Sequence, residues 1–433
     1  MSPDAIAPDT SDHPPITGRQ VAAAVMGNAL EFYDFTTYTI FAVDIGKAFF
    51  PSQSPFVSLM ASLGAFGAGF LTRPIGALAI GAIGDRIGRR PAMLLSFSLM
   101  GLASTPSFAQ IGVAAPILAV VLRLVQGFAL GGEVGPATAF LIEAAPPHRR
   151  GLVGAWQSAS QSVASLVGGA IGASLAVMLA PALLEAFGWR AAFYLGALVL
   201  PFGLILRRSL PETLHRAEAV SNAVPETTDV GAHAPILIFG LAVILCFTTS
   251  TYVRLYITTY ATTTLHMAAS AAYGASVVNG AVGIVFTLLG GWLSDLYGRK
   301  RVMIIPLVVY LAVIYPVFWL MVRNHDVPTL WIGSGVVSAL GSLSTGPALI
   351  VLAEGLHKGL RSTGMGVVYA VSVALFGGAT QPLIAWLIHT TGEPLAPAFY
   401  LMITTVIGII AMVVVKETAP ILIDRAAATG AVV

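Results

Sequence analysis

Two carboxylates stand one helical turn apart in an apolar stretch of the sequence. Glu31 and Asp34 belong to the segment GNALEFYDF, and most residues around them are apolar. Asn28, Glu31 and Asp34 follow one another in steps of three, so on a helix they form a polar stripe along one face. Ionisable groups inside a membrane usually face the protein interior, where they carry protons, bind ions or pair with opposite charges.

Arg123 is a candidate partner for these carboxylates, because it lies near the middle of a second apolar stretch that also contains Glu133. An ionised carboxylate beside a guanidinium holds it in an ion pair, and protonation ends the pairing and frees the arginine for an anion. Proton and anion then bind cooperatively. We therefore predict that Glu31, Asp34 and Glu133 couple transport to protons and that Arg123 binds substrate.

Permanent ion pairs are the alternative role for buried charges. This role is the preferred prediction for Arg73, which directly precedes a proline, and it is an equal alternative for Glu133.

Other polar residues in apolar stretches are predicted to bind substrate. Gln157 and Gln161 are four residues apart, so one helix face can present both amides, although hydrogen bonding between helices is an alternative role. Arg254 lies in the outer half of its apolar stretch, so it can face inward or sit at the outer mouth. A second inward arginine would suit a substrate with more than one carboxylate, because arginine pairs with carboxylates in a bidentate manner. The predicted substrate ligands are Asn28, Arg123, Gln157, Gln161, Tyr252, Arg254 and Asn279.

The composition is that of an integral membrane protein. Of the 433 residues, 56% are hydrophobic and 10% are charged, whereas soluble domains have about 25% charged residues. The net charge of +2 and the scattered basic residues do not suggest a nucleic-acid partner. Cys246 is the single cysteine, so no disulfide framework or thiol metal site is expected. With no metal-ligand cluster, phosphate loop or nucleophile–base motif, we expect neither an enzyme nor a cofactor.

A membrane-spanning helix needs about 20 predominantly apolar residues, and twelve stretches of the sequence are long enough. We therefore predict an all-α integral membrane protein with spans at 19–46, 56–83, 90–109, 113–139, 150–179, 189–208, 235–263, 270–296, 300–321, 328–353, 360–390 and 395–416. Most of the 22 Lys and Arg residues fall in segments that share one side with the termini. The positive-inside rule places that side in the cytoplasm.

Polar segments divide the chain into two bundles of six helices, 19–208 and 235–416. Residues 209–234 form the longest polar interruption and are predicted to be a cytoplasmic linker. Residues 1–18 are polar and rich in proline and are predicted to be a disordered cytoplasmic tail, and 417–433 form a second tail.

The two halves carry related sequences at corresponding places. GDRIGRR (84–90) follows the second span and SDLYGRK (294–300) follows the eighth, while LIEAAPPHRRG and VLAEGLHKGLR end the fourth and tenth spans. Two independent features that recur at nearly the same distance indicate a duplication. Duplicated halves around a central site are an established plan of secondary transporters.

These motifs resemble the signature of the major facilitator superfamily. GNALEFYDF, RLVQGFALGGEVG, WQSASQ and LPET further resemble the metabolite–proton symporters, and among them the citrate and tricarballylate proton symporters. The resemblance implies twelve helices in two pseudo-symmetric bundles and a cytoplasmic latch between them. The implied latch residues are Asp85, Arg86, Arg89, Arg90, Glu143, Asp295, Arg299, Glu354 and Arg361. Leu296 stands where the first copy has Arg86, which implies that the second latch is weaker.

The membrane potential favours a coupled mechanism. Entry of an anion into a cell that is negative inside is opposed by about 2.3 kcal/mol per charge per 100 mV, and protons that enter with it reverse the sign. We therefore predict a symporter that takes up protons with a carboxylate, citrate or a related di- or tricarboxylate, across a bacterial cytoplasmic (inner) membrane. Its partners would be the substrate, protons and lipid, and it would be a monomer. The alternatives are a symporter of a zwitterionic osmolyte or an aromatic acid, and a membrane sensor that does not transport.

Overall fold

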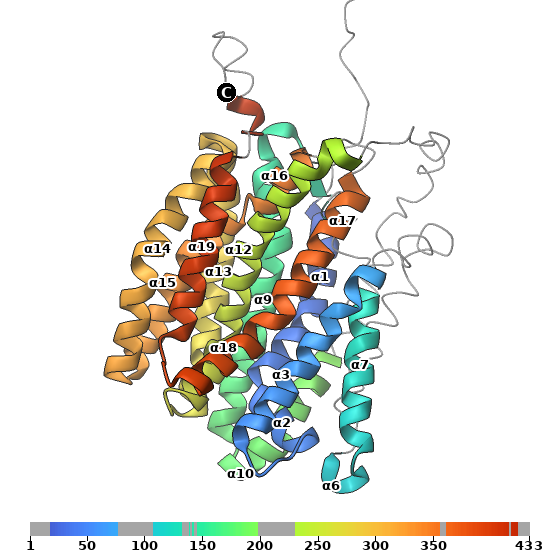
Figure 1. The fold of residues 1–433 in the computed structure, drawn as a ribbon, viewed down its shortest axis with the longest axis vertical. Helices are drawn as coiled ribbons and strands as arrows, with labels where there is room; N and C mark the ends of the chain where they lie inside the picture. Colours follow the sequence, from blue (N-terminus) through green and yellow to red (C-terminus); the bar gives the residue numbers. More distant parts are fainter. Residues whose placement is uncertain are drawn as a thin grey trace, which may run out of the picture.

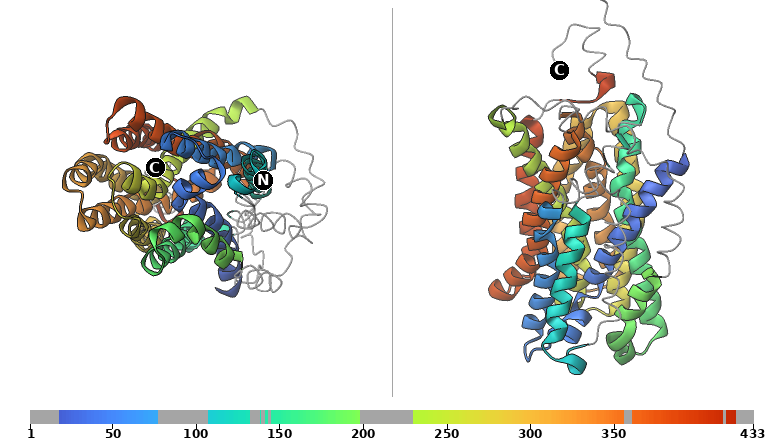
Figure 2. Two further views of the ribbon diagram at one scale, coloured as in Figure 1. Left: turned by 90° about the horizontal axis from the view of Figure 1, so that it is seen from below. Right: turned by 90° about the vertical axis from the view of Figure 1, so that its right-hand side faces the viewer.

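The computed structural model describes residues 18–76, 107–131, 138, 141–142, 145–197, 230–355, 361–414 and 417–422. All regular elements within these ranges are helical, which confirms the predicted all-α class. Eight of the described helices are long and apolar enough to cross a membrane. They run side by side along one direction, as Figures 1 and 2 show from three sides.

The first half of the chain begins with a long helix that breaks near Phe41 and continues as a short one. Ser54 caps the next long helix, because its side chain accepts a hydrogen bond from the N–H of Val57 and Pro55 occupies the first helical position. The elements of this half are α1 (Gly18–Ile40), α2 (Ala42–Phe49), α3 (Pro55–Leu71), α6 (Phe108–Ile111), α7 (Ala114–Gly131), η2 (Pro147–Arg149), α9 (Arg150–Met178), α10 (Pro181–Leu183) and η3 (Leu184–Gly188).

The second half of the chain is described almost without a gap. Its elements are α12 (Val230–Thr263), α13 (Ala269–Tyr297), α14 (Arg299–Asn324), α15 (Val327–Thr345), α16 (Ala348–Gly355), α17 (Arg361–Ser372), η5 (Val373–Gly377), α18 (Gly378–Thr391) and α19 (Ala396–Val414). Most of these helices begin and end within a few residues of the predicted spans. α12 instead begins at Val230, inside the segment predicted as a linker.

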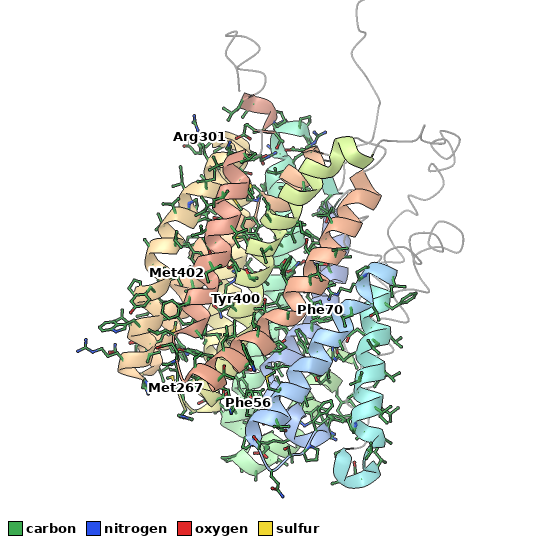
Figure 3. All side chains as sticks on the ribbon, viewed as in Figure 1. Phe56, Phe70, Met267, Arg301, Tyr400 and Met402 are labelled. Carbon is green, nitrogen blue, oxygen red and sulfur yellow. The ribbon has the colours of Figure 1, made fainter. Side chains whose placement is uncertain are left out.

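The bundle has two distinct ends. Residues 417–422 and Arg301 lie at one end, named here the terminal end, and Phe56 lies toward the opposite end (Figures 1 and 3). Glu417 accepts hydrogen bonds from the backbone N–H groups of Arg299 (2.9 Å) and Lys300 (3.1 Å) at the start of α14. A helix N-terminus leaves such groups unpaired, so the segment predicted as the second tail begins with residues that are held against the bundle.

Small residues allow α9 of the first half to pack closely along α13 of the second. A Cβ atom added at Gly291 would lie 2.5 Å from Ala155 Cβ and 2.5 Å from the carbonyl oxygen of Gly151. One added at Gly169 would lie 2.8 Å from the backbone nitrogen of Val277. Small residues at such positions let helix backbones approach each other in membranes, and here they hold the two halves together around the site.

An aromatic cluster fills the space between the halves beside this contact. Phe66 stacks on Tyr38, with ring centroids 5.6 Å apart, and packs against Phe35 at 5.9 Å. Tyr252 of the second half meets Phe70 edge-on at 5.3 Å. These rings surround the buried arginines described next.

Candidate functional site

Asp34 of α1 and Arg123 of α7 form a buried ion pair. Arg123 Nη1 lies 3.0 Å from Asp34 Oδ2, and the two side chains are only 2% and 5% exposed. Gln126 completes a triangle, since its amide donates to the same carboxylate oxygen and its Oε1 accepts from Arg123 at 2.5 Å. Asp34 Oδ1 is buried and has no hydrogen-bond partner in the described part of the chain.

Arg73 lies beside this pair without a carboxylate of its own among the described side chains. Its guanidinium carbon is 4.7 Å from the ring centroid of Phe35 and 4.2 Å from that of Phe70. Its buried Nε has no hydrogen-bond partner among the residues that the structure describes. Arg123 is likewise 4.1 Å from the ring centroid of Tyr38. No described salt bridge includes Arg73, and the described contacts of its guanidinium are with aromatic faces. The ion pair of Arg73 stays a prediction, because candidate partners such as the Glu31 side chain lie outside the described residues.

A cavity lies between the halves, lined by residues of α1, α9, α12, α13 and α15. Its polar lining consists mainly of hydroxyl and amide groups, such as Ser158 and Gln161 of α9 and Ser276 of α13. Arg254 is the one charged residue among the described lining residues. The cavity can therefore hold a polar solute and presents it with a single fixed charge, which is positive.

Four predicted ligands line this cavity, namely Gln161, Tyr252, Arg254 and Asn279. Arg123 is not among the lining residues.

Asn28 and Gln157 also lie outside the described lining and bind each other across α1 and α9. Gln157 Nε2 donates to Asn28 Oδ1 at 3.0 Å, and Asn28 Nδ2 donates to the Gln157 carbonyl at 3.1 Å and to Ser160 Oγ at 2.5 Å. This arrangement matches the alternative role given above for Gln157, hydrogen bonding between helices.

Asp295 links the halves at the terminal end. Its carboxylate accepts hydrogen bonds from the backbone N–H groups of Gly151 (2.8 Å) and Leu152 (2.9 Å) in the first turn of α9. A carboxylate is favoured there by the helix dipole. Arg299 holds Asp295 at 2.6 Å and Glu354 at 3.3 Å. The second copy of the predicted latch thus joins the halves through backbone donors, with Leu296 exposed beside it.

The halves also meet at the opposite end. The ring of Phe56 in α3 stacks on that of His389 in α18, with centroids 3.6 Å apart and planes inclined by 11°. Phe41 packs against Tyr273 of α13 at 5.2 Å. The cavity is therefore bounded by contacts between the halves toward both ends of the bundle.

Several predicted residues fall outside the described part of the chain. These are the side chains of Glu31 and Arg361, and the whole of Glu133, Asp85, Arg86, Arg89, Arg90 and Glu143.

Other groups in these contacts were not predicted. Gln126 follows Arg123 by three residues, and this spacing on one helix face was a readable signal. Ser342, which accepts a hydrogen bond from Arg254, and Glu417 offer no comparable pattern.

Comparison with known proteins agrees with this architecture. The model of the Major Facilitator Superfamily matches residues 24–286 and, in a second match, 238–429. The protein therefore belongs to the major facilitator superfamily, with its twelve-helix fold in two bundles of six, and it is a multi-pass membrane transporter rather than an enzyme.

Curated relatives and solved structures are similar over most of their lengths. A citrate–proton symporter of Salmonella typhi is 32% identical over 416 residues, which cover 93% of this chain and 95% of that protein. One from Klebsiella pneumoniae is 33% identical, with 89% and 88% covered. A proline/betaine transporter of Escherichia coli (strain K12) is 29% identical, with 93% and 84% covered. A D-xylose–proton symporter structure superimposes with a TM-score of 0.70 at 18% identity, with 93% and 98% covered, and supports the fold.

Proposed function

We propose that this protein takes up a carboxylate, citrate or a related di- or tricarboxylate, together with protons by alternating access. The observation that carries the proposal is the buried Asp34–Arg123 pair next to a cavity whose one charged group among the described lining residues is the cation Arg254. Similarity to two citrate–proton symporters over about nine-tenths of the chain supports the substrate class.

The charges near the cavity favour an anion. Among the described side chains near the cavity there are three guanidinium groups, those of Arg73, Arg123 and Arg254, and one carboxylate, that of Asp34. Protonation of Asp34 removes this negative charge and releases Arg123 from its ion pair. The positive potential in the cavity then rises, so that a proton and an anionic substrate each favour binding of the other.

The aromatic residues favour a carboxylate over a quaternary ammonium group. Such a cation binds over free aromatic faces. Here Arg73 lies over Phe35 and Phe70, and Arg123 lies over Tyr38. Among these rings Phe35 lines the cavity, and the guanidinium over its face would repel a second cation. The proline/betaine relatives keep a zwitterionic osmolyte as the second candidate.

The remaining residues are assigned as follows. Glu31 and Glu133 stay proposed proton-coupling residues beside Asp34, while Gln161, Tyr252, Arg254 and Asn279 are the proposed substrate ligands. Arg123 and Gln126 control the charge of the site from behind the lining. Asp295, Arg299 and Glu354 latch the terminal end, and the corresponding first copy would be Asp85, Arg86, Arg89, Arg90 and Glu143, with Arg361 in the second.

The proposed setting is the bacterial inner membrane with the terminal end in the cytoplasm. Arg149 and Arg150 begin α9 at this end, and Arg299, Lys300 and Arg301 begin α14 there. The positive-inside rule assigns such a cluster to the cytoplasm. The two bundles enclose the cavity within one chain, so we propose a monomer.

Uptake into proteoliposomes tests this proposal. The purified protein is reconstituted, an inward proton gradient is imposed, and accumulation of labelled citrate, tricarballylate, succinate and betaine is compared with and without an uncoupler. We expect at least one carboxylate to accumulate and the uncoupler to abolish the accumulation. If betaine accumulates and none of the three carboxylates does, the proposed substrate class is wrong.

A further inference from the structure

Arg254 is held in the cavity by neutral partners. Its Nε donates to the carbonyl of Ser250 at 3.3 Å, and its Nη2 donates to Thr251 Oγ1 at 3.1 Å. Its Nη1 donates to Ser342 Oγ and, at 3.5 Å, to the carbonyl of Ser338. A guanidinium has five N–H donors, and none of the described salt bridges involves this one. Its charge is therefore positioned but not neutralised.

Glycine at position 341 leaves room for this arrangement. A Cβ atom there would lie 2.9 Å from Ser250 Oγ and 3.9 Å from the guanidinium carbon of Arg254. The guanidinium can thus lie close to the α15 backbone, where Ser338 and Ser342 fix its orientation. Four of the five N–H donors are used by these neutral tethers, so the guanidinium offers a carboxylate its uncompensated charge and one remaining Nη2 N–H.

Asn279 supplies an acceptor next to this cation. Its Nδ2 donates to the backbone carbonyl of Arg254 at 3.2 Å, which orients the amide. Its Oδ1 is buried and lacks a hydrogen-bond partner among the described atoms, and the residue lines the cavity. A buried acceptor without a donor is unfavourable, and a ligand that donates a hydrogen bond to it removes this cost.

We propose that Arg254 and Asn279 form a subsite for a hydroxycarboxylate, in which Arg254 binds the carboxylate and Asn279 Oδ1 accepts from the neighbouring hydroxyl. This inference rests on the proposed carboxylate transport and specifies its substrate further. Citrate has such a hydroxyl and tricarballylate does not, so the subsite favours citrate. At neutral pH the carboxyl groups of both compounds are largely ionised and cannot replace the hydroxyl as donor.

Binding measurements on the purified full-length protein test the subsite. Dissociation constants for citrate and tricarballylate are measured calorimetrically at neutral pH. We expect Arg254→Gln to weaken the binding of citrate and of tricarballylate by about 10- to 100-fold each, because a hydrogen bond to a charged group is lost. Asn279→Ala should weaken the binding of citrate by about 2- to 10-fold and leave the binding of tricarballylate unchanged. The preference for citrate should then disappear.

The matched control is Arg323→Gln, which removes an exposed arginine of the same half that packs on Trp319. Both affinities should stay at the wild-type value. Arg254→Lys keeps the charge and serves if the glutamine variant does not fold. Its affinities for both compounds should be reduced, because lysine lacks the planar guanidinium that Thr251, Ser338 and Ser342 hold in place. Wild-type affinity in both Arg254 variants, or an unchanged citrate preference in Asn279→Ala, overturns the subsite alone. A wild-type protein that binds betaine but no carboxylate overturns the proposed function as well.

Discussion

The carboxylate of Asp34 and the guanidinium of Arg123 meet at 3.0 Å outside the cavity lining. Phe35 and Thr36, which follow Asp34 on α1, do line the cavity. The ring centroid of Phe35 also lies 5.9 Å from the Arg123 guanidinium. We therefore propose that a change in the ion pair reaches the cavity through the first helix and through electrostatic potential, without direct contact between Asp34 and substrate.

Replacement of Asp34 by asparagine should uncouple transport from the proton gradient. The asparagine amide cannot release or gain a proton, so Arg123 stays in one electrostatic state throughout the cycle. We expect accumulation driven by a pH gradient to be lost while exchange of external for internal substrate continues. Uptake and exchange in the same proteoliposomes separate the two activities.

The matched control for this variant is Asp326→Asn. Asp326 caps α15 by accepting from the Thr329 N–H at 2.7 Å, and asparagine caps a helix about as well. Accumulation should match that of the wild-type protein. Full gradient-driven accumulation in Asp34→Asn would remove Asp34 from the coupling mechanism.

Replacement of Asp295 by asparagine should loosen the terminal end. The charge that faces the first turn of α9 is lost, along with the ion pair to Arg299, while the side chain keeps its size. We expect the cavity to open more often toward this end. A cysteine at Ser158, in a protein whose buried Cys246 is replaced by alanine, should then react several-fold faster with a thiol reagent added from that side. An unchanged rate would mean that this contact is not a latch.

Replacement of Gly291 by alanine should destabilise the contact between α9 and α13. The added methyl group would lie 2.5 Å from Ala155 Cβ, and overpacking of this kind costs about 1–3 kcal/mol. We expect a lower midpoint of thermal unfolding in detergent.

Gly64→Ala is the control for this change. A Cβ atom at Gly64 has no neighbour within 4 Å, and alanine is the better helix former. Its unfolding midpoint should equal or exceed the wild-type value. Equal unfolding midpoints for the two alanine variants would show that α9 and α13 can move apart to admit the methyl group without loss of stability.

Replacement of Phe56 by alanine should weaken closure at the opposite end. The ring of His389 loses its stacking partner across the two halves. The same cysteine at position 158 should then react faster with a reagent added from the opposite side, and its reactivity from the terminal side should not rise. A rise on the terminal side alone would contradict the role of this stack.

The helices were predictable, whereas several of the pairings were not. Hydrophobic length identified α13 and α14 because a membrane span requires a run of apolar residues. Gln157 and Gln161 share a helix face by spacing, yet only Gln161 lines the cavity. Four residues advance a helix about 40° beyond a full turn, which is enough to direct one amide toward Asn28.

Backbone partners leave no trace in side-chain patterns. Asp295 was predicted to act in a latch, but its partners are N–H groups of Gly151 and Leu152, which any residue except proline supplies. For Arg73, the step of three residues from Phe70 was a readable signal, whereas Phe35 comes from another helix and left none. Such contacts follow from the packing of helices, which spacing within one helix does not determine.

Proton movement that accompanies substrate entry tests the central claim most directly. Proteoliposomes that contain a pH-sensitive dye are prepared without a proton gradient, and citrate is added outside. We predict that citrate acidifies the interior of vesicles with the wild-type protein and leaves it unchanged in vesicles with Asp34→Asn. Entry of labelled citrate into wild-type vesicles without acidification, or equal acidification by the variant, would contradict the account.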